Sequence, residues 1–213
     1  PAQLANRCSA PAGPLNLKAP GWNGWGNDYD NTHFQPKPGL KAEDVPRLKL
    51  KWAFAYAATM AIGQPVVVGN RLYVTTDSGQ VLSLNAQTGC AYWAFSVGAP
   101  VRTSVSVGPL PNGAVKNSKA KFAAYFGDER AFVYAVDAET GAELWRLKLD
   151  DHPVARITGS PVLHANRLYV PVSSVEEAIS RPDKYECCKF RGAMAAVDAY
   201  TGKLLWKSYS IPA

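Results

Sequence analysis

The nine residues NAQTGCAYW, at positions 85–93, recur further along the chain as DAETGAELW at 137–145 and as DAYTGKLLW at 198–206. Each copy opens with Asn or Asp, carries a Thr-Gly pair and places a tryptophan four residues after the glycine. A similarity that returns at intervals of about 50 to 60 residues indicates a repeated supersecondary unit. We therefore expect one structural element to be built three times.

The residues of this unit predict a tight hairpin turn followed by a strand. The short side chain of Asn85, Asp137 or Asp198 can accept hydrogen bonds from the next backbone N–H groups. The glycine supplies the positive φ angle that a bulged hairpin turn requires. The tryptophan then stands on one face of the following strand, where its large apolar ring can fill the space between neighbouring sheets.

Short segments with the pattern of β-strands surround each copy of the unit, and turns rich in glycine and asparagine separate them. Convincing helical periodicity is absent, and 175–179 is the single short helical candidate. Each repeat therefore has four predicted strands. They are 64–68, 71–75, 80–84 and the segment around Trp93 in the first repeat, 102–107, 121–126, 131–136 and 143–149 in the second, and 160–163, 167–172, 193–197 and 203–206 in the third.

Four antiparallel strands in each repeat are typical of a propeller blade. The predicted fold class is all-β, a partial β-propeller of three four-stranded blades plus one extra strand at 48–54, which contains Trp52. A β-sandwich with coincidental turn signals is the alternative. We divide the chain into an N-terminal lead-in segment, 1–47, and an incomplete propeller domain, 48–213. Three blades cannot close a ring, so we expect the chain to be part of a longer protein.

Charge and composition argue against several classes of function. The 213 residues carry a formal net charge of +6, but the charges are dispersed and form no basic stripe typical of nucleic-acid binding. The chain has no apolar run long enough to predict a membrane-spanning helix. Four cysteines without a Cys-x-x-Cys pair indicate an oxidising compartment, so we expect a periplasmic or secreted protein without a zinc site or a covalent c-type haem.

The Thr-Gly-x-x-x-Trp repeat resembles the tryptophan-docking motif of the pyrroloquinoline-quinone (PQQ) dehydrogenase superfamily, whose propellers have eight blades. The stretches WNGWGND at 22–28, NTHFQ at 31–35 and DVPRLKLKW at 44–52 look like the lead-in of that superfamily. Residues 150–192 are similar to polyvinyl-alcohol dehydrogenases over a long and specific match. The resemblance therefore covers nearly the whole chain.

This resemblance implies a quinoprotein alcohol dehydrogenase that uses PQQ and Ca²⁺. An alcohol, secondary or polymeric, would be oxidised at the quinone, the metal would polarise a quinone carbonyl, and electrons would pass to a cytochrome c. The superfamily's catalytic aspartate is expected downstream of this chain, so no residue here is assigned as catalytic and we expect no turnover from these 213 residues alone. The alternative is a non-enzymatic propeller of the same lineage, such as the outer-membrane assembly lipoprotein, that serves as a binding scaffold of the cell envelope.

By the same resemblance, Cys187 and Cys188 form a disulfide that stacks on the quinone, as the adjacent cysteines of methanol dehydrogenases do. The pair here falls between the second and third strands of the third blade, whereas methanol dehydrogenases carry theirs just before the second blade. Two free thiols, or separate bridges to Cys8 and Cys90, are the alternatives. If the adjacent pair is joined, Cys8–Cys90 is the remaining bridge.

Further site residues follow from the resemblance and from the chemistry of the cofactor. Arg102 aligns with an arginine that contacts PQQ and Arg191 lies close to the cysteine pair, and a guanidinium group fits a carboxylate of PQQ bidentately. Thr158 and Ser174 are predicted to reach the cofactor with hydroxyl or backbone groups. Glu177 follows a serine-containing turn, as the calcium-binding glutamate of the superfamily does, and a hard cation prefers carboxylate oxygen. Lesser candidates are Glu176 for the metal, and Arg156 and Lys184 for the cofactor.

Overall fold

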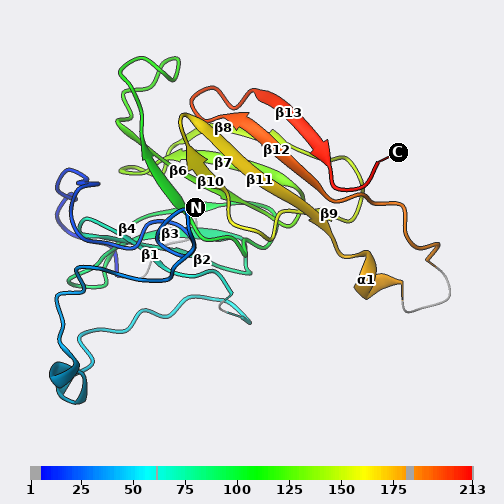
Figure 1. Ribbon diagram of the computed structural model, residues 1–213. Coiled ribbons are helices and arrows are strands. Elements are labelled where there is room, and N and C mark those ends of the chain that lie inside the picture. Colours follow the sequence, from blue (N-terminus) through cyan, green and yellow to red (C-terminus); the bar gives the residue numbers. More distant parts are fainter. Residues whose placement is uncertain (1–5, 61, 181–184, 213) are drawn as a thin grey trace.

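The computed structural model describes residues 6–60, 62–180 and 185–212. These residues form three antiparallel sheets that follow one another along the chain and stand beside one another in space (Figure 1). The strand orders are β1-β2-β3-β4, β5-β6-β7-β8 and β10-β11-β12-β13, and the short strand β9 pairs with β11. Because spatial order equals chain order in every sheet, each sheet is a propeller blade, and the predicted partial propeller is confirmed.

The strand bounds agree with the predicted segments to within three residues, except that β5 begins at Ser106, four residues after the predicted start at 102. Neither the 3-10 helix η1 (Ala42–Arg47) nor β9 was predicted, whereas α1 (Glu176–Ile179) falls on the predicted short helix. The strands are β1 (Val66–Val68), β2 (Arg71–Thr75), β3 (Gln80–Asn85), β4 (Ala91–Ser96), β5 (Ser106–Pro109), β6 (Phe122–Gly127), β7 (Phe132–Asp137), β8 (Glu143–Lys148), β9 (Ala155–Arg156), β10 (Val162–His164), β11 (Arg167–Ser174), β12 (Ala193–Asp198) and β13 (Leu204–Tyr209).

The tryptophan of one blade docks on the turn of the next blade. Trp93 of β4 donates a hydrogen bond from Nε1 to the carbonyl of Ala138 at 3.2 Å, and its ring lies over Gly141. Trp145 of β8 docks on Gly202 of the third blade in the same way. A Cβ atom on either glycine would lie 2.7 Å from the indole ring, and both glycines have positive φ angles. Only glycine therefore fits this turn.

The extra strand predicted at 48–54 does not form. A strand requires a partner for its ladder of hydrogen bonds, and none of the described segments pairs with these residues. Trp52 nevertheless covers Gly89 and donates to the carbonyl of Ala86 at 3.2 Å, while Phe54 packs with it on the first blade. The segment thus makes the docking contact of a neighbouring blade without belonging to a sheet.

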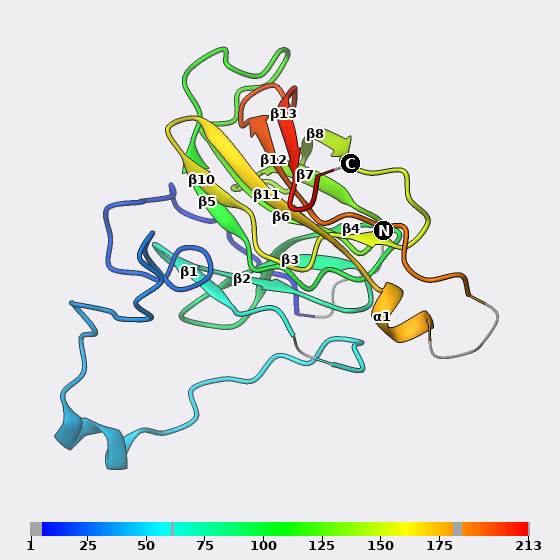
Figure 2. The ribbon, with the colours of Figure 1, turned by 45° about the vertical axis from the view of Figure 1, so that its right-hand side comes forward.

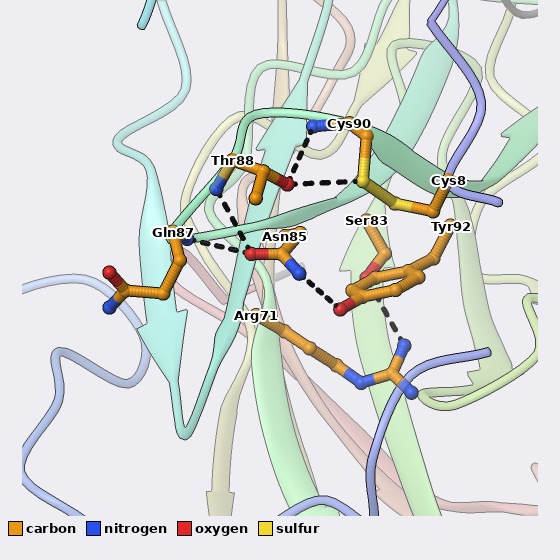
Figure 3. Close-up of a disulfide and its surroundings, with 8 residues drawn as sticks. All are labelled: Cys8, Arg71, Ser83, Asn85, Gln87, Thr88, Cys90 and Tyr92. Atoms are coloured by element: carbon orange, nitrogen blue, oxygen red, sulfur yellow. Dashed lines mark hydrogen bonds between the residues drawn. A yellow bond between two sulfur atoms is a disulfide. The ribbon is translucent and has the colours of Figure 1, made fainter. Parts of the chain in front are cut away.

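The lead-in segment crosses the first blade from its outer strand to its inner strand. A disulfide joins Cys8 to Cys90, the residue before β4 (Figure 3). Leu15 is buried in the apolar cluster between the first and second blades. Trp22 then exchanges two backbone hydrogen bonds, of 2.7 and 2.9 Å, with Val67 of β1. Residues 6–22 therefore tie the two edges of this blade together.

Polar side chains of the first blade also bind the turn at 138–141 that Trp93 covers. Tyr73 of β2 is fully buried and donates from its hydroxyl to the carbonyl of Ala138 at 3.0 Å. Burial raises the pKa of Tyr73 because it disfavours the phenolate, so this hydroxyl remains a donor. Arg71, which is 3% exposed, donates to the carbonyl of Glu139 at 3.1 Å and stacks over the ring of Tyr92 (Figure 3). The blade interface is thus held by apolar packing and by directional bonds.

The topology decides which loops gather at one end of the blades. Antiparallel neighbours are joined alternately at the two ends of a sheet, so the link between the second and third strands shares an end with the link to the next blade. Backbone bonds connect these loops, from Val101 to Thr76 (3.0 Å), from Glu129 to Pro100 (3.0 Å) and from Ile157 to Asp128 (2.9 Å). We call this end the entry end. It comprises 76–79, 97–105, 128–131, 149–161, 175–180 and 185–192.

An ion pair at the entry end makes the stability of the third blade depend on pH. Lys207 of β13 donates to the carboxylate of Asp150, and both side chains are largely buried. Burial alone raises the pKa of Asp150, but the hydrogen bonds from Lys207 and from the amide of His152 more than offset this effect, so the pKa lies below its ordinary value. The pair therefore stabilises the fold above the ordinary pKa, and this stabilisation is lost as the pH falls through the lowered pKa.

We expect the free energy of unfolding of the unmodified chain to fall more steeply than that of Asp150→Asn below about pH 4. Near neutral pH the variant should be less stable by about 1–3 kcal/mol, because it loses a hydrogen bond between charged groups. Urea unfolding curves across this pH range measure both quantities. Parallel pH profiles for the two proteins would contradict the assignment.

Candidate cofactor site

Two arginines meet one glutamate at the entry end. Arg102 comes from the loop before β5, Glu129 from the turn between β6 and β7, and Arg156 from β9. Oε1 of Glu129 lies 3.6 Å from Nε of Arg102, and Oε2 accepts a hydrogen bond from Arg156. Glu129 is 12% exposed, and the buried Nε of Arg102 has no hydrogen-bond partner among the described residues. The group thus keeps an excess of positive charge and one unsatisfied donor.

The turn that carries Glu129 is rigid. The neighbouring Asp128 is 1% exposed, and its Oδ1 accepts the amides of Arg130 and Phe132, each at 2.9 Å. Its Oδ2 accepts the hydroxyl of Tyr134 at 2.9 Å, and burial together with the charge of Asp128 raises the pKa of that tyrosine. Because both carboxylate oxygens of Asp128 accept hydrogen bonds from the turn and from β7, the turn holds Glu129 in position between the two arginines.

Hydroxyl groups lie next to this charged group. The Oγ1 atom of Thr158 is 3.0 Å from Oγ of Ser173, and β9 pairs Arg156 with Ser173. Ser174, the residue predicted from the sequence, pairs with Ala155 and accepts a long 3.4 Å bond from the next helix. Sequence analysis did not select Ser173. Because side chains alternate along a strand, the sequence shows that Ser173 and Ser174 point in opposite directions, but not which of them faces Thr158.

The two adjacent glutamates of α1 have different environments. Glu176 is 4% exposed, and Glu177, the predicted metal ligand, is exposed. Burial alone raises the pKa of Glu176, but hydrogen bonds from Lys189, Tyr185 and Phe190 outweigh it, so the pKa lies below its usual range. Within the described ranges, no three His, Cys, Asp or Glu side chains come together as metal ligands.

The adjacent cysteines are joined to each other, and a cis peptide bond links them. Cys187 and Cys188 are both exposed, beyond the end of α1 on the segment that projects from the third blade (Figure 2). The guanidinium group of Arg191 stacks 4.2 Å above the ring of Tyr209 and donates to the carbonyl of Ile211. Lys184, a lesser candidate, falls outside the described residues.

A cavity of about 480 Å³ lies elsewhere, between the lead-in segment and the inner strands β5 and β10. Trp25 and Tyr29 of the lead-in line it together with Leu163 and Tyr200. It extends toward the β10–β11 turn at Asn166, which is at the opposite end from the charged group. None of the predicted site residues lines this cavity.

Blades locked by docked tryptophans, with charged and hydroxyl groups gathered at one end of the inner strands, define a propeller of the quinoprotein type. The chain belongs to the PQQ_2 family, whose model, described as outer membrane protein assembly factor BamB, matches residues 37–212. Neither helix of the described residues is long and apolar enough to cross a membrane.

Two relatives are polyvinylalcohol dehydrogenases. One, from Pseudomonas sp., is 49% identical over 205 residues, and the other, from Sphingopyxis sp. (strain 113P3), is 46% identical over 207 residues. These matches cover 96% and 97% of this chain but 31% of each relative, so the chain spans about a third of their length. The resemblance found in the sequence is therefore confirmed.

Solved structures show the same fold. The quinohemoprotein alcohol dehydrogenase from Comamonas testosteroni superposes with a TM-score of 0.72 at 24% sequence identity, covering 91% of this chain and 28% of that protein. At this identity the match supports the propeller architecture and nothing finer.

Proposed function

We propose that this chain supplies one wall of the cofactor site of a PQQ-dependent alcohol dehydrogenase. The observation that carries the proposal is the group of Arg102, Glu129 and Arg156, in which a buried guanidinium N–H is unsatisfied. PQQ is a polycarboxylate, and planar guanidinium groups are the protein's best partners for carboxylates. The residues present therefore fit the group. When bound, PQQ accepts the electrons of the alcohol, and the chain's contribution is to orient and charge-balance it.

Several residues would hold the cofactor. Arg102 and Arg156 would bind the carboxylates of PQQ. The hydroxyls of Thr158 and Ser173, which lie 3.0 Å apart beside Arg156 in the sheet, would meet its polar edge, and Ser174 remains a sequence-based candidate. Cys187–Cys188 would offer a sulfur surface to its ring, and Arg191 remains a sequence-based candidate. For Ca²⁺ we propose Glu177, whose exposed carboxylate could join ligands from elsewhere in the protein.

The proposed function also includes a substrate, an electron acceptor and a cellular location. The alcohol would be a secondary or polymeric one, in keeping with the polyvinylalcohol dehydrogenases to which the chain is similar. Electrons would pass to a cytochrome c. Two disulfides are consistent with an oxidising compartment, so we propose a periplasmic location.

In the full-length protein, Arg102→Gln should weaken binding of PQQ about tenfold to a hundredfold, because a hydrogen bond to a charged group contributes about 1.5–3 kcal/mol. Titration of PQQ in the presence of Ca²⁺, followed by quenching of tryptophan fluorescence, gives the dissociation constant. The control is Arg167→Gln, which removes an exposed arginine at the opposite end of the third blade and should leave the affinity unchanged. Equal affinities for the two variants would refute the site.

The second candidate function is a non-enzymatic scaffold, and the description of the matching family model as an assembly factor favours it. The two functions differ in a direct assay. With PQQ, Ca²⁺ and a short alcohol, the full-length enzyme should reduce an artificial dye. If it neither reduces the dye nor binds PQQ, the scaffold is the correct function.

A further inference from the structure

A buried carboxylate grips the chain on both sides of the exposed disulfide. Oε1 of Glu176 accepts the hydroxyl of Tyr185 at 2.8 Å and the amide of Lys189 at 2.9 Å, and Oε2 accepts the amide of Phe190 at 3.0 Å. The cysteine pair lies between Tyr185 and Lys189 in the sequence. Both flanks of the disulfide are therefore bonded to one oxygen atom.

The carboxylate is itself held by the rigid entry end. The amide of Val175 donates to the carbonyl of Val154 at 3.3 Å, which attaches α1 to the loop before β9. From the same loop, Nε2 of His152 lies 4.0 Å from Oε1 of Glu176, and its ring meets that of Phe190 edge-on at 5.5 Å. The cysteine segment is thus connected to the blade through Glu176 and this aromatic contact.

We infer that Glu176 is a positioning residue that fixes the segment carrying Cys187–Cys188 against α1. A carboxylate has about four lone-pair sites, and three of them are used here by donors of this one segment. The two cysteines are exposed, so apolar burial does not order them. Ordering an exposed segment costs backbone entropy, and charge-assisted bonds to Glu176 offset that cost.

The consequence for catalysis rests on the proposed function. If the disulfide contacts the quinone ring, its segment must be held in one position so that the same face of the disulfide always meets the ring. Without Glu176 the disulfide would remain covalently intact, but its place relative to Arg102 would vary. The role of Glu176 is therefore to orient a neighbouring group, not to contact the substrate.

Hydrogen exchange in Glu176→Gln tests this inference directly. The glutamine keeps one acceptor oxygen but loses the charge and the second oxygen, so the amides of Lys189 and Phe190 should exchange about tenfold to a hundredfold faster than in the unmodified protein. The matched control is Glu177→Gln, the exposed neighbour on the same helix, which should leave both amides unchanged when both proteins are measured without Ca²⁺. Unchanged exchange in Glu176→Gln, or equal acceleration in both variants, would overturn the inference.

A milder variant keeps the inference testable if Glu176→Gln does not fold. Tyr185→Phe removes one donor to Glu176 and leaves the carboxylate in place. We expect a smaller acceleration at Lys189 with an unchanged urea midpoint, and no acceleration in this variant would also count against the inference.

These measurements need no quinone, so they stand apart from the proposed function. In the full-length protein, weaker PQQ binding by Glu176→Gln together with faster exchange would support both. Faster exchange with unchanged PQQ affinity would keep Glu176 as the positioning residue and would place the disulfide away from the quinone.

Discussion

Replacing Trp93 with alanine should lower the free energy of unfolding of this chain by about 3–5 kcal/mol, the usual cost of deleting a large buried aromatic side chain. Trp93 is 6% exposed and belongs to the apolar cluster between the first and second blades. Its loss would open a cavity over Gly141 and remove the hydrogen bond to Ala138. Urea unfolding followed by far-ultraviolet circular dichroism measures the change.

The chain contains its own control for this experiment. Trp206 occupies the same position in the third repeat, but it is 43% exposed and no described turn lies over it. We therefore expect Trp206→Ala to cost less than about 1 kcal/mol. If the two alanine variants lose equal stability, docking on the next blade is not what holds the tryptophan.

Removal of the Cys8–Cys90 bridge by Cys8→Ser with Cys90→Ser should destabilise the chain by up to about 4–5 kcal/mol. The bridge joins residues 82 positions apart, so it restricts a long loop in the unfolded chain. In the folded state it fastens the lead-in to β4, where Cys8 also donates to the carbonyl of Ala91 at 3.0 Å. Urea unfolding in the absence of reducing agent gives the difference.

The second disulfide is the matched comparison. Cys187 and Cys188 are adjacent, so their bridge closes almost no loop and restricts the unfolded chain very little. Cys187→Ser with Cys188→Ser should therefore change the free energy of unfolding by less than about 1 kcal/mol. Equal losses in the two double variants would mean that the length of the closed loop does not determine how much each bridge stabilises the chain.

The charged group of the site was predicted only in part. Arg102 was chosen from the resemblance, and its role stays a prediction; in the structure it lies in the loop before β5 at the entry end. Glu129 carried no signal, because a lone glutamate in a turn looks like any solvated charge. It matters because the turn between β6 and β7 brings it between the loops that carry Arg102 and Arg156.

Sequence alone could not decide between the two adjacent serines or between the two adjacent glutamates. Residues 173–174 and 176–177 each offer two like side chains one position apart, so the choice between them depends on the register of β9 against β11 and on the rotation of α1. The structure buries Glu176 and gives Ser173 the contact with Thr158, one step from the predicted Glu177 and Ser174.

The local sequence was sufficient to predict the blades of this protein. The turn glycine, the capping Asn or Asp and the tryptophan act within nine residues, so their meaning can be understood without knowing the rest of the chain. The features that the sequence did not predict depend on long-range contacts. Whether 48–54 finds a ladder partner, whether Arg191 faces Arg102 or Tyr209, and which glutamate is buried all depend on surfaces brought together from distant segments. The free energy of such contacts belongs to pairs of residues, and neither member of a pair carries it alone.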